Sequence, residues 1–200
     1  MKIQYAGLAL LLVAAPGFLL GQLPQGTTAK SFGVSVRTAT INQTTPSAVL
    51  PGDGSLAQAQ ASEISVASLV SVHDAFAIAT GDGTAPADAG SSATLGSVRI
   101  LDGLITADAV VAIASSTPEG SSTEGSSVAN LVVNGTAVID PAPNTRVDLP
   151  GVGYVVLNEQ TTTSGGVTVN MIHVVLQQLG LTGLRTTGEI IVGSASSQVN

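Results

Sequence analysis

Residues 63–72 read Glu-Ile-Ser-Val-Ala-Ser-Leu-Val-Ser-Val. Apolar and small polar side chains alternate along this stretch, and a period of two residues is typical of a β-strand with one buried face. Only 55–62, an Ala/Gln-rich segment of about two turns, is a helical candidate, and an isolated helix that short is marginal. The period-two pattern returns at 33–37, 98–100, 105–113, 128–133, 137–140, 154–158, 167–176 and 189–192.

Turn signals separate these predicted strands. Asp102-Gly103 and Asn134-Gly135 stand between apolar runs, which is a strong hairpin signal. Leu50-Pro51-Gly52 and Leu149-Pro150-Gly151 place Pro before Gly, as type II turns require. The polar segment 161–166 joins two predicted strands. Neighbouring strands should therefore run antiparallel.

The sequence predicts an all-β fold, an antiparallel sandwich-like domain with long hairpins. Sandwich cores usually contain aromatic side chains, whereas only 2% of this chain is aromatic. The small side chains also suit a β-solenoid or a mixed form, which is the alternative. Residues 65–70 and 127–132 are similar to each other, but a repeat architecture needs a fixed period that this chain lacks.

The N-terminus reads as an export signal. Lys2 precedes an apolar run at residues 6–20, which is shorter than the roughly 20 residues of a membrane span. Thr27-Thr28-Ala29 fits a cleavage site, and Gly21 is a poorer second choice. An uncleaved anchor is the alternative. We expect a signal peptide at 1–29, a single β-rich extracellular domain at 30–200, no membrane span after cleavage, and an extracellular or cell-surface location.

Composition narrows the function classes. Six basic and thirteen acidic residues give a net charge of −7, and the isoelectric point is near 4.4. Nucleic-acid phosphates would repel such a surface. The absence of Cys excludes disulfides, thiolate metal sites and a Cys nucleophile. No catalytic, cofactor-binding or metal-binding residue is assigned, and no cofactor is expected.

The two histidines, His73 and His173, are interpreted as structural or surface residues. The parity of His173 places it on the opposite strand face from Ile172, in contact with solvent or a neighbouring strand. Zinc usually needs at least three protein ligands, more than two histidines supply. A catalytic triad also needs a nucleophile and an orienting acid beside the histidine.

Several acidic residues could carry other chemistry. Asp102, Asp108, Glu159 and Glu189 lie in or beside predicted strands, but a glycosidase cleft needs two convergent carboxylates and usually aromatic platforms. Asp108 borders the apolar window 109–114 and is interpreted as a solvated acid that guards an edge strand. In a separate pair of loops, Gly52-Asp53-Gly54 and Gly81-Asp82-Gly83 could offer oxygens to calcium but read better as plain turns.

Six strings stand out between about residues 32 and 199: Gly33-Val-Ser-Val36, Asp102-Gly-Leu-Ile-Thr-Ala-Asp-Ala-Val110, Leu149-Pro-Gly-Val-Gly153, Leu157-Asn-Glu-Gln160, Val169-Asn-Met-Ile-His-Val174 and Gly188-Glu-Ile-Ile-Val-Gly-Ser-Ala195. Together they resemble the choice-of-anchor P family of bacterial exported proteins. The resemblance implies a secreted or surface-attached domain.

Together these observations predict a non-enzymatic secreted or cell-surface-associated structural or adhesive β-domain. Its expected partners are a second copy of itself, or a cell-surface polymer or protein. The alternative is a secreted module that binds a carbohydrate or another small ligand, with or without calcium. Low charge and the absence of Pro in 109–114 predict association through that segment.

Overall fold

The computed structural model describes residues 26–82, 87–180 and 183–199. Within these residues the chain forms sixteen β-strands, one 3-10 turn, η1 (Leu101–Gly103), and no α-helix. The strands are β1 (Thr28–Thr38), β2 (Asn42–Val49), β3 (Ala57–Val66), β4 (Val70–Gly81), β5 (Ala89–Leu95), β6 (Val98–Ile100), β7 (Ile105–Ala107), β8 (Ala109–Thr117), β9 (Gly120–Ser122), β10 (Ser127–Ala129), β11 (Leu131–Val133), β12 (Thr136–Val138), β13 (Thr145–Leu149), β14 (Gly153–Thr163), β15 (Gly166–Gly180) and β16 (Gly183–Gln198).

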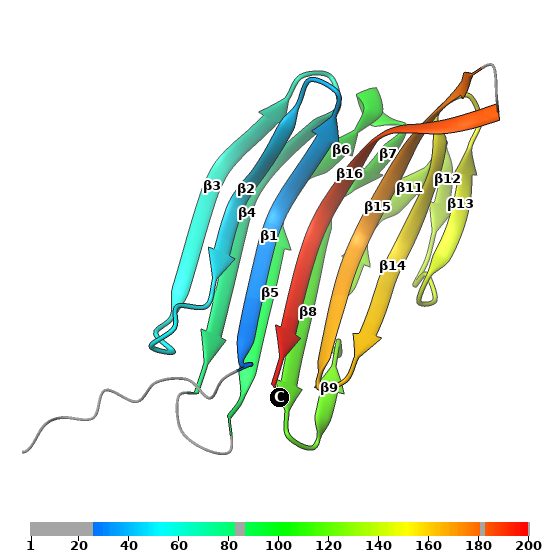
Figure 1. The fold of residues 1–200 in the computed structure, drawn as a ribbon. Coiled ribbons are helices and arrows are strands. Elements are labelled where there is room, and N and C mark those ends of the chain that lie inside the picture. Colours follow the sequence, from blue (N-terminus) through cyan, green and yellow to red (C-terminus); the bar gives the residue numbers. More distant parts are fainter. Residues whose placement is uncertain (1–25, 83–86, 181–182, 200) are drawn as a thin grey trace, which may run out of the picture.

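The strands form two sheets. Sheet A has the order β13-β14-β15-β16-β1-β2, and sheet B has the order β10-β8-β5-β4-β6-β7-β11-β12, with β3 added to β4 and β9 to β8. All these pairings are antiparallel. The sheets lie face to face, with β1 and β16 packed against β5 (Figure 1). The predicted all-β, antiparallel, sandwich-like fold is confirmed.

In β4 and β16, the set of alternate side chains that points inward changes partway along the strand. In β16, Ile190 and Val192 are buried on one side of Gly193, and Ala195 and Ser197 are buried on the other. Gly193 has φ +69°, which non-glycine residues adopt rarely. The same change of phase occurs in β4, around Asp74 with φ +53°. β4 and β16 therefore each present two inward-facing rows of opposite parity.

On one side of this change of phase the inward side chains are mostly Val, Ile and Leu. On the other side, which we call the small-residue half, the central strands β1, β4, β5, β8 and β16 bury mainly Ala and Ser. These buried side chains are Ala29, Ser31, Ala75, Ala77, Ala79, Ala89, Ser91, Ala93, Ala112, Ala114, Ser116, Ala195 and Ser197.

Short hydroxyl side chains bridge the two sheets in the small-residue half. The Ser31 hydroxyl of β1 donates to the carbonyl oxygen of Ile78 in β4 over 2.8 Å, and the Ser91 hydroxyl of β5 donates to that of Ser196 in β16 over 2.9 Å. Because a serine side chain is short, the two backbones must lie close together here. Close approach lets small side chains fill the interlayer space, which explains how a sandwich forms with few aromatic residues.

Four of the predicted turns join the expected strands. The type II turn predicted at Leu50-Pro51-Gly52 is wrong, because Gly52 has no positive φ and the Gly54 N–H donates to the Pro51 carbonyl instead. Asn134-Gly135 connects β11 to β12, and the Asp102-Gly103 segment connects β6 to β7 through η1. At 149–152, the Val152 N–H donates to the Leu149 carbonyl, and Gly151 has φ +78°, as a type II turn requires. The 161–166 segment forms the turn between β14 and β15.

Two expectations are wrong. The helical candidate at 55–62 belongs largely to β3, because its alternating Ala and Gln side chains suit a strand that pairs with β4. The window 109–114 is also not an open edge. β8 pairs with β5 on one side, and β10, β9 and the Ser126 hydroxyl occupy its other side. That hydroxyl accepts a hydrogen bond from the Ile113 N–H and donates one to the Ile113 carbonyl.

The first residues of the chain, including most of the predicted signal peptide, lie outside the described residues. β1 begins at Thr28, and Ala29 is buried and pairs with Ser197. The alternative cleavage after Gly21 would therefore leave β1 complete. Across the described ranges, no helix is long and apolar enough to cross a membrane.

Candidate functional site

A polar network surrounds His173 on the outer face of sheet A. His173 lies in β15, and its Nδ1 is 2.9 Å from Oε2 of Glu159 in β14. Its Nε2 is 3.6 Å from Oε2 of Glu189 in β16. The side chain of His173 is only 16% exposed, because neighbouring strands flank it on both sides. The predicted contact of His173 with neighbouring strands is confirmed.

Further residues extend this network across four strands. The Asn170 side-chain amide donates through Nδ2 to Oε2 of Glu159 over 2.7 Å, and the Ser194 hydroxyl donates to Oδ1 of Asn170 over 2.7 Å. On the other side, Arg37 of β1 donates to Glu189 over 3.1 Å. The network thus joins β14, β15, β16 and β1.

The contact between His173 and Glu159 shifts the pKa of both side chains. The hydrogen bond that His173 donates to Glu159 raises the pKa of His173, and burial opposes this effect. The hydrogen bond from His173 lowers the pKa of Glu159, again against burial. A protonated His173 between two carboxylates is therefore favoured over a wider pH range than a free imidazole.

The network joins neighbouring strands and does not have the arrangement of a serine triad. A triad would require a serine hydroxyl within hydrogen-bond reach of His173. Ser194 instead donates to Asn170, and the imidazole nitrogens lie against carboxylates. The sequence did not reveal this cluster. The register pairs Glu159 with Asn170 and Val156 with His173, so regular alternation would place Glu159 and His173 on opposite faces. Asn158, with φ +49°, interrupts this alternation, and the sequence carries no signal of it.

The remaining candidate residues lie apart from the network. Asp108 accepts a 2.7 Å hydrogen bond from the amide of Asn130, at the break between β7 and β8. It therefore stabilises that break, and its interpretation as the guard of an edge strand is wrong. His73 lies in β4 with an exposed side chain, and Asp102 lies in η1 with φ +55°.

The two proposed calcium loops differ in what the structure shows. Asp53 accepts from both the backbone N–H and the hydroxyl of Ser55, which is the geometry of a plain turn. Part of the second loop, 83–86, lies outside the described residues. Within the described ranges, no group of three or more His, Asp or Glu side chains is placed to hold a metal ion.

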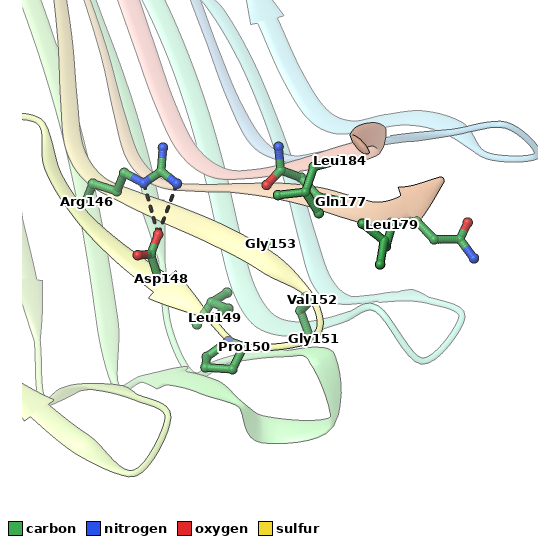
Figure 2. Close-up of a pocket in the computed structure, with 11 residues that line it drawn as sticks. Arg146, Asp148, Leu149, Pro150, Gly151, Val152, Gly153, Gln177, Leu179 and Leu184 are labelled. Carbon is green, nitrogen blue, oxygen red and sulfur yellow. Dashed lines mark hydrogen bonds and ion pairs between the residues drawn. The ribbon is translucent and has the colours of Figure 1, made fainter. Parts of the chain in front are cut away.

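A groove of about 450 Å³ lies between the β13–β14 turn and the far end of the β15–β16 hairpin (Figure 2). Leu179 and Leu184 are paired across the hairpin and are 78% and 68% exposed. At the opposite end, Arg146 forms an ion pair with Asp148 and stacks over the ring of Tyr154, with Cζ 3.8 Å from the ring centroid. The groove is lined by Arg146, Asp148, Leu149, Pro150, Gly151, Val152, Gly153, Gln177, Gln178, Leu179 and Leu184.

The groove offers one apolar wall and one polar end. Such a combination suits a small amphipathic ligand, since apolar contacts supply affinity and a few polar groups fix orientation. In the sequence, Leu149-Pro150-Gly151 signals a turn and carries no sign of the groove.

Comparisons with known proteins assign no relative. No family model matches the chain, no curated protein matches it, and no solved structure matches it. The resemblance to the choice-of-anchor P family therefore stays a prediction, and the functional argument depends on the fold and its surfaces.

Proposed function

We propose that the protein is a non-catalytic β-domain that works outside the cell, free or attached to the cell surface, as a structural or adhesive component. The main support is the small-residue half. There, serine hydroxyls bridge two closely packed sheets at Ser31, Ser91 and Ser116. Fully paired buried polar groups favour a single rigid arrangement of the layers.

The titratable groups that the fold brings together support the same role. His173, Glu159, Glu189 and Arg37 bind one another across four neighbouring strands. Their charges pair with one another within the sheet. Such a network resists sliding of one strand along the next. A rigid sheet with broad outer faces suits a component that acts by contact.

Export is the other half of the proposal, and the apolar run after Lys2 supports it. The test is to fractionate cells that produce the protein and to sequence its N-terminus. We expect the protein in the culture fluid or the cell envelope, beginning at Lys30, or at Gln22 if cleavage follows Gly21. Cytoplasmic protein with Met1 retained would contradict export.

The non-catalytic part needs its own assay. Purified protein is incubated with chromogenic ester and glycoside substrates, beside the Glu159→Gln and His173→Gln variants. We expect no turnover above buffer for any of the three proteins. Turnover by the wild type that either variant abolishes would assign the His173 network to an enzyme.

The groove supports a second candidate, the binding of a carbohydrate or another small ligand. Arg146, Asp148, Gln177 and Gln178 would supply hydrogen bonds, and Leu179 with Leu184 would supply apolar contact. Calorimetric titration with a panel of oligosaccharides, repeated with Arg146→Ala, tests this candidate. Saturable binding that weakens about tenfold in the variant would favour it, and no heat with any sugar would reject carbohydrate as its ligand.

A further inference from the structure

We propose that the free edge of β3 pairs with β3 of a second copy of this chain, in antiparallel orientation about a two-fold axis. This interface deepens the structural role proposed above and rests on it. Its test uses purified protein, so its failure would remove the interface and leave the evidence on export unchanged.

One edge of β3 is open. Sheet B ends at β3, which pairs with β4 along residues 57–66 and with no further strand in the part of the chain described. An edge strand presents backbone N–H and C=O groups that another strand can bind. β3 is ten residues long, so it offers a long template.

The other edges carry features that discourage such pairing. β2 contains Pro46, which has no N–H to donate. β13 has five residues and exposes the charged Arg146 and Asp148, while β9, β10 and β12 have three residues each. β3 contains no Pro and no Lys, and its single charge is Glu63.

Residues 57–61 of β3 and their partners 75–79 in β4 carry no charged side chain. Gln58 and Gln60 are exposed on the outer face, and their partners in β4 are Ile78 and Phe76. Phe76 is 46% exposed, and Leu56, immediately before the strand, is 61% exposed. Two copies that each carry a charge of −7 repel one another in general, but little charge opposes contact at this edge.

The sequence of β3 also suits pairing with itself. With Ala59 on the two-fold axis, Gln58 lies opposite Gln60 of the second copy, and Ala57 lies opposite Ala61. This register keeps both pairs of glutamines on the outer face, because residues directly opposite each other in an antiparallel pair point to the same face of the sheet. It also places Glu63 opposite Ser55 rather than opposite a second carboxylate, and it covers part of Leu56.

The test is a charge exchange at the two glutamines. Gln58→Lys/Gln60→Lys places like charges in opposing cross-strand positions, and Gln58→Glu/Gln60→Glu does the same with the opposite sign. We expect sedimentation equilibrium to show concentration-dependent dimers for the wild type. Each charged variant should raise the dissociation constant about tenfold or more, and an equimolar mixture of the two should associate again.

The matched control is Thr80→Lys/Thr94→Lys, which adds the same charge to exposed positions of β4 and β5 on the same sheet. We expect this control to dimerise as the wild type does, and thermal melts should show that all variants fold. A wild type that stays monomeric overturns the proposal. Equal weakening by the control, or no association in the mixture, also overturns it.

Discussion

The hydroxyl oxygens of Ser116 and Ser197 lie 2.8 Å apart and join β8 of sheet B to β16 of sheet A. Both side chains are buried, and Ser116 is also 2.9 Å from the Ser121 hydroxyl. The space between the sheets at this point therefore fits serine, and both hydroxyls have polar partners.

Ser116→Val should destabilise the fold. Valine adds volume to a closely packed gap and leaves the Ser197 hydroxyl without this partner, so we expect the free energy of unfolding to fall by about 2–4 kcal/mol. Ser115→Val is the matched control, because Ser115 is exposed on the outer face of the same strand. Its effect should stay within about 0.5 kcal/mol, by urea denaturation. Equal losses in the two variants would show that the gap is not as tight as described.

The sequence predicted most of the strands and several hairpins, because period-two alternation and turn dipeptides are local signals. It could not predict the close approach of the sheets. That approach depends on Ser116 and Ser197, 81 residues apart, facing each other across the interlayer space. The change of parity at Gly193 and Asp74 is unpredictable for a similar reason, since it appears only when neighbouring strands are aligned.

Gly193→Ala should be among the most damaging single substitutions in β16. Gly193 has φ +69°, and a Cβ there would lie 2.6 Å from Cγ1 of Val110 in the opposite sheet. We expect a loss of about 2–4 kcal/mol from backbone strain and overpacking together. Gly90→Ala is the control, because the nearest atom to its Cβ is 4.0 Å away. A thermal melt that ranks Gly90→Ala as equally harmful would contradict this assignment.

Stability should depend on pH through His173 and Glu159. The pKa of His173 is raised, so its contribution is fully present below the unfolded value of about 6.5 and is lost as pH rises through the folded value. The pKa of Glu159 is lowered, so its contribution is present above about 4.3 and is lost as pH falls through the folded value. The contribution of the pair should be largest between about pH 4.5 and 6.5.

Melting temperatures across pH for His173→Gln test this pair. The variant should melt lower than the wild type at pH 6, and the difference should shrink at alkaline pH. His73→Gln is the control, because it removes the other histidine, which is exposed in β4. A difference between wild type and His173→Gln that is constant across pH would show that the ion pair contributes nothing.

Asp108→Ala should affect stability rather than association. Asp108 accepts a hydrogen bond from Asn130 and lies beside a strand whose edges are both occupied. We expect a loss of about 1 kcal/mol and unchanged light scattering near the isoelectric point of about 4.4. Stronger scattering than the wild type under those conditions would restore the edge-guard interpretation of Asp108.

The candidate site was less predictable than the fold. The face of His173 followed from strand parity, but its partners Glu159 and Glu189 come from two other strands and depend on the registers of both pairs. The groove could not be predicted from the sequence, for another reason. Leu179 and Leu184 look like ordinary apolar strand residues, and only the structure shows them exposed.

The structural role rests on the two sheets behaving as one rigid body, and native-state hydrogen exchange measures this most directly. We predict that the amides of Ala77, Ala112 and Ala195 in the small-residue half exchange only through global unfolding. Their free energy of exchange should equal that of the amides of Val72 and Ile100, on the side where the inward side chains are mostly Val, Ile and Leu. If the small-residue half opens at a clearly lower free energy, its serine bridges do not hold the layers together, and the rigid structural role is contradicted.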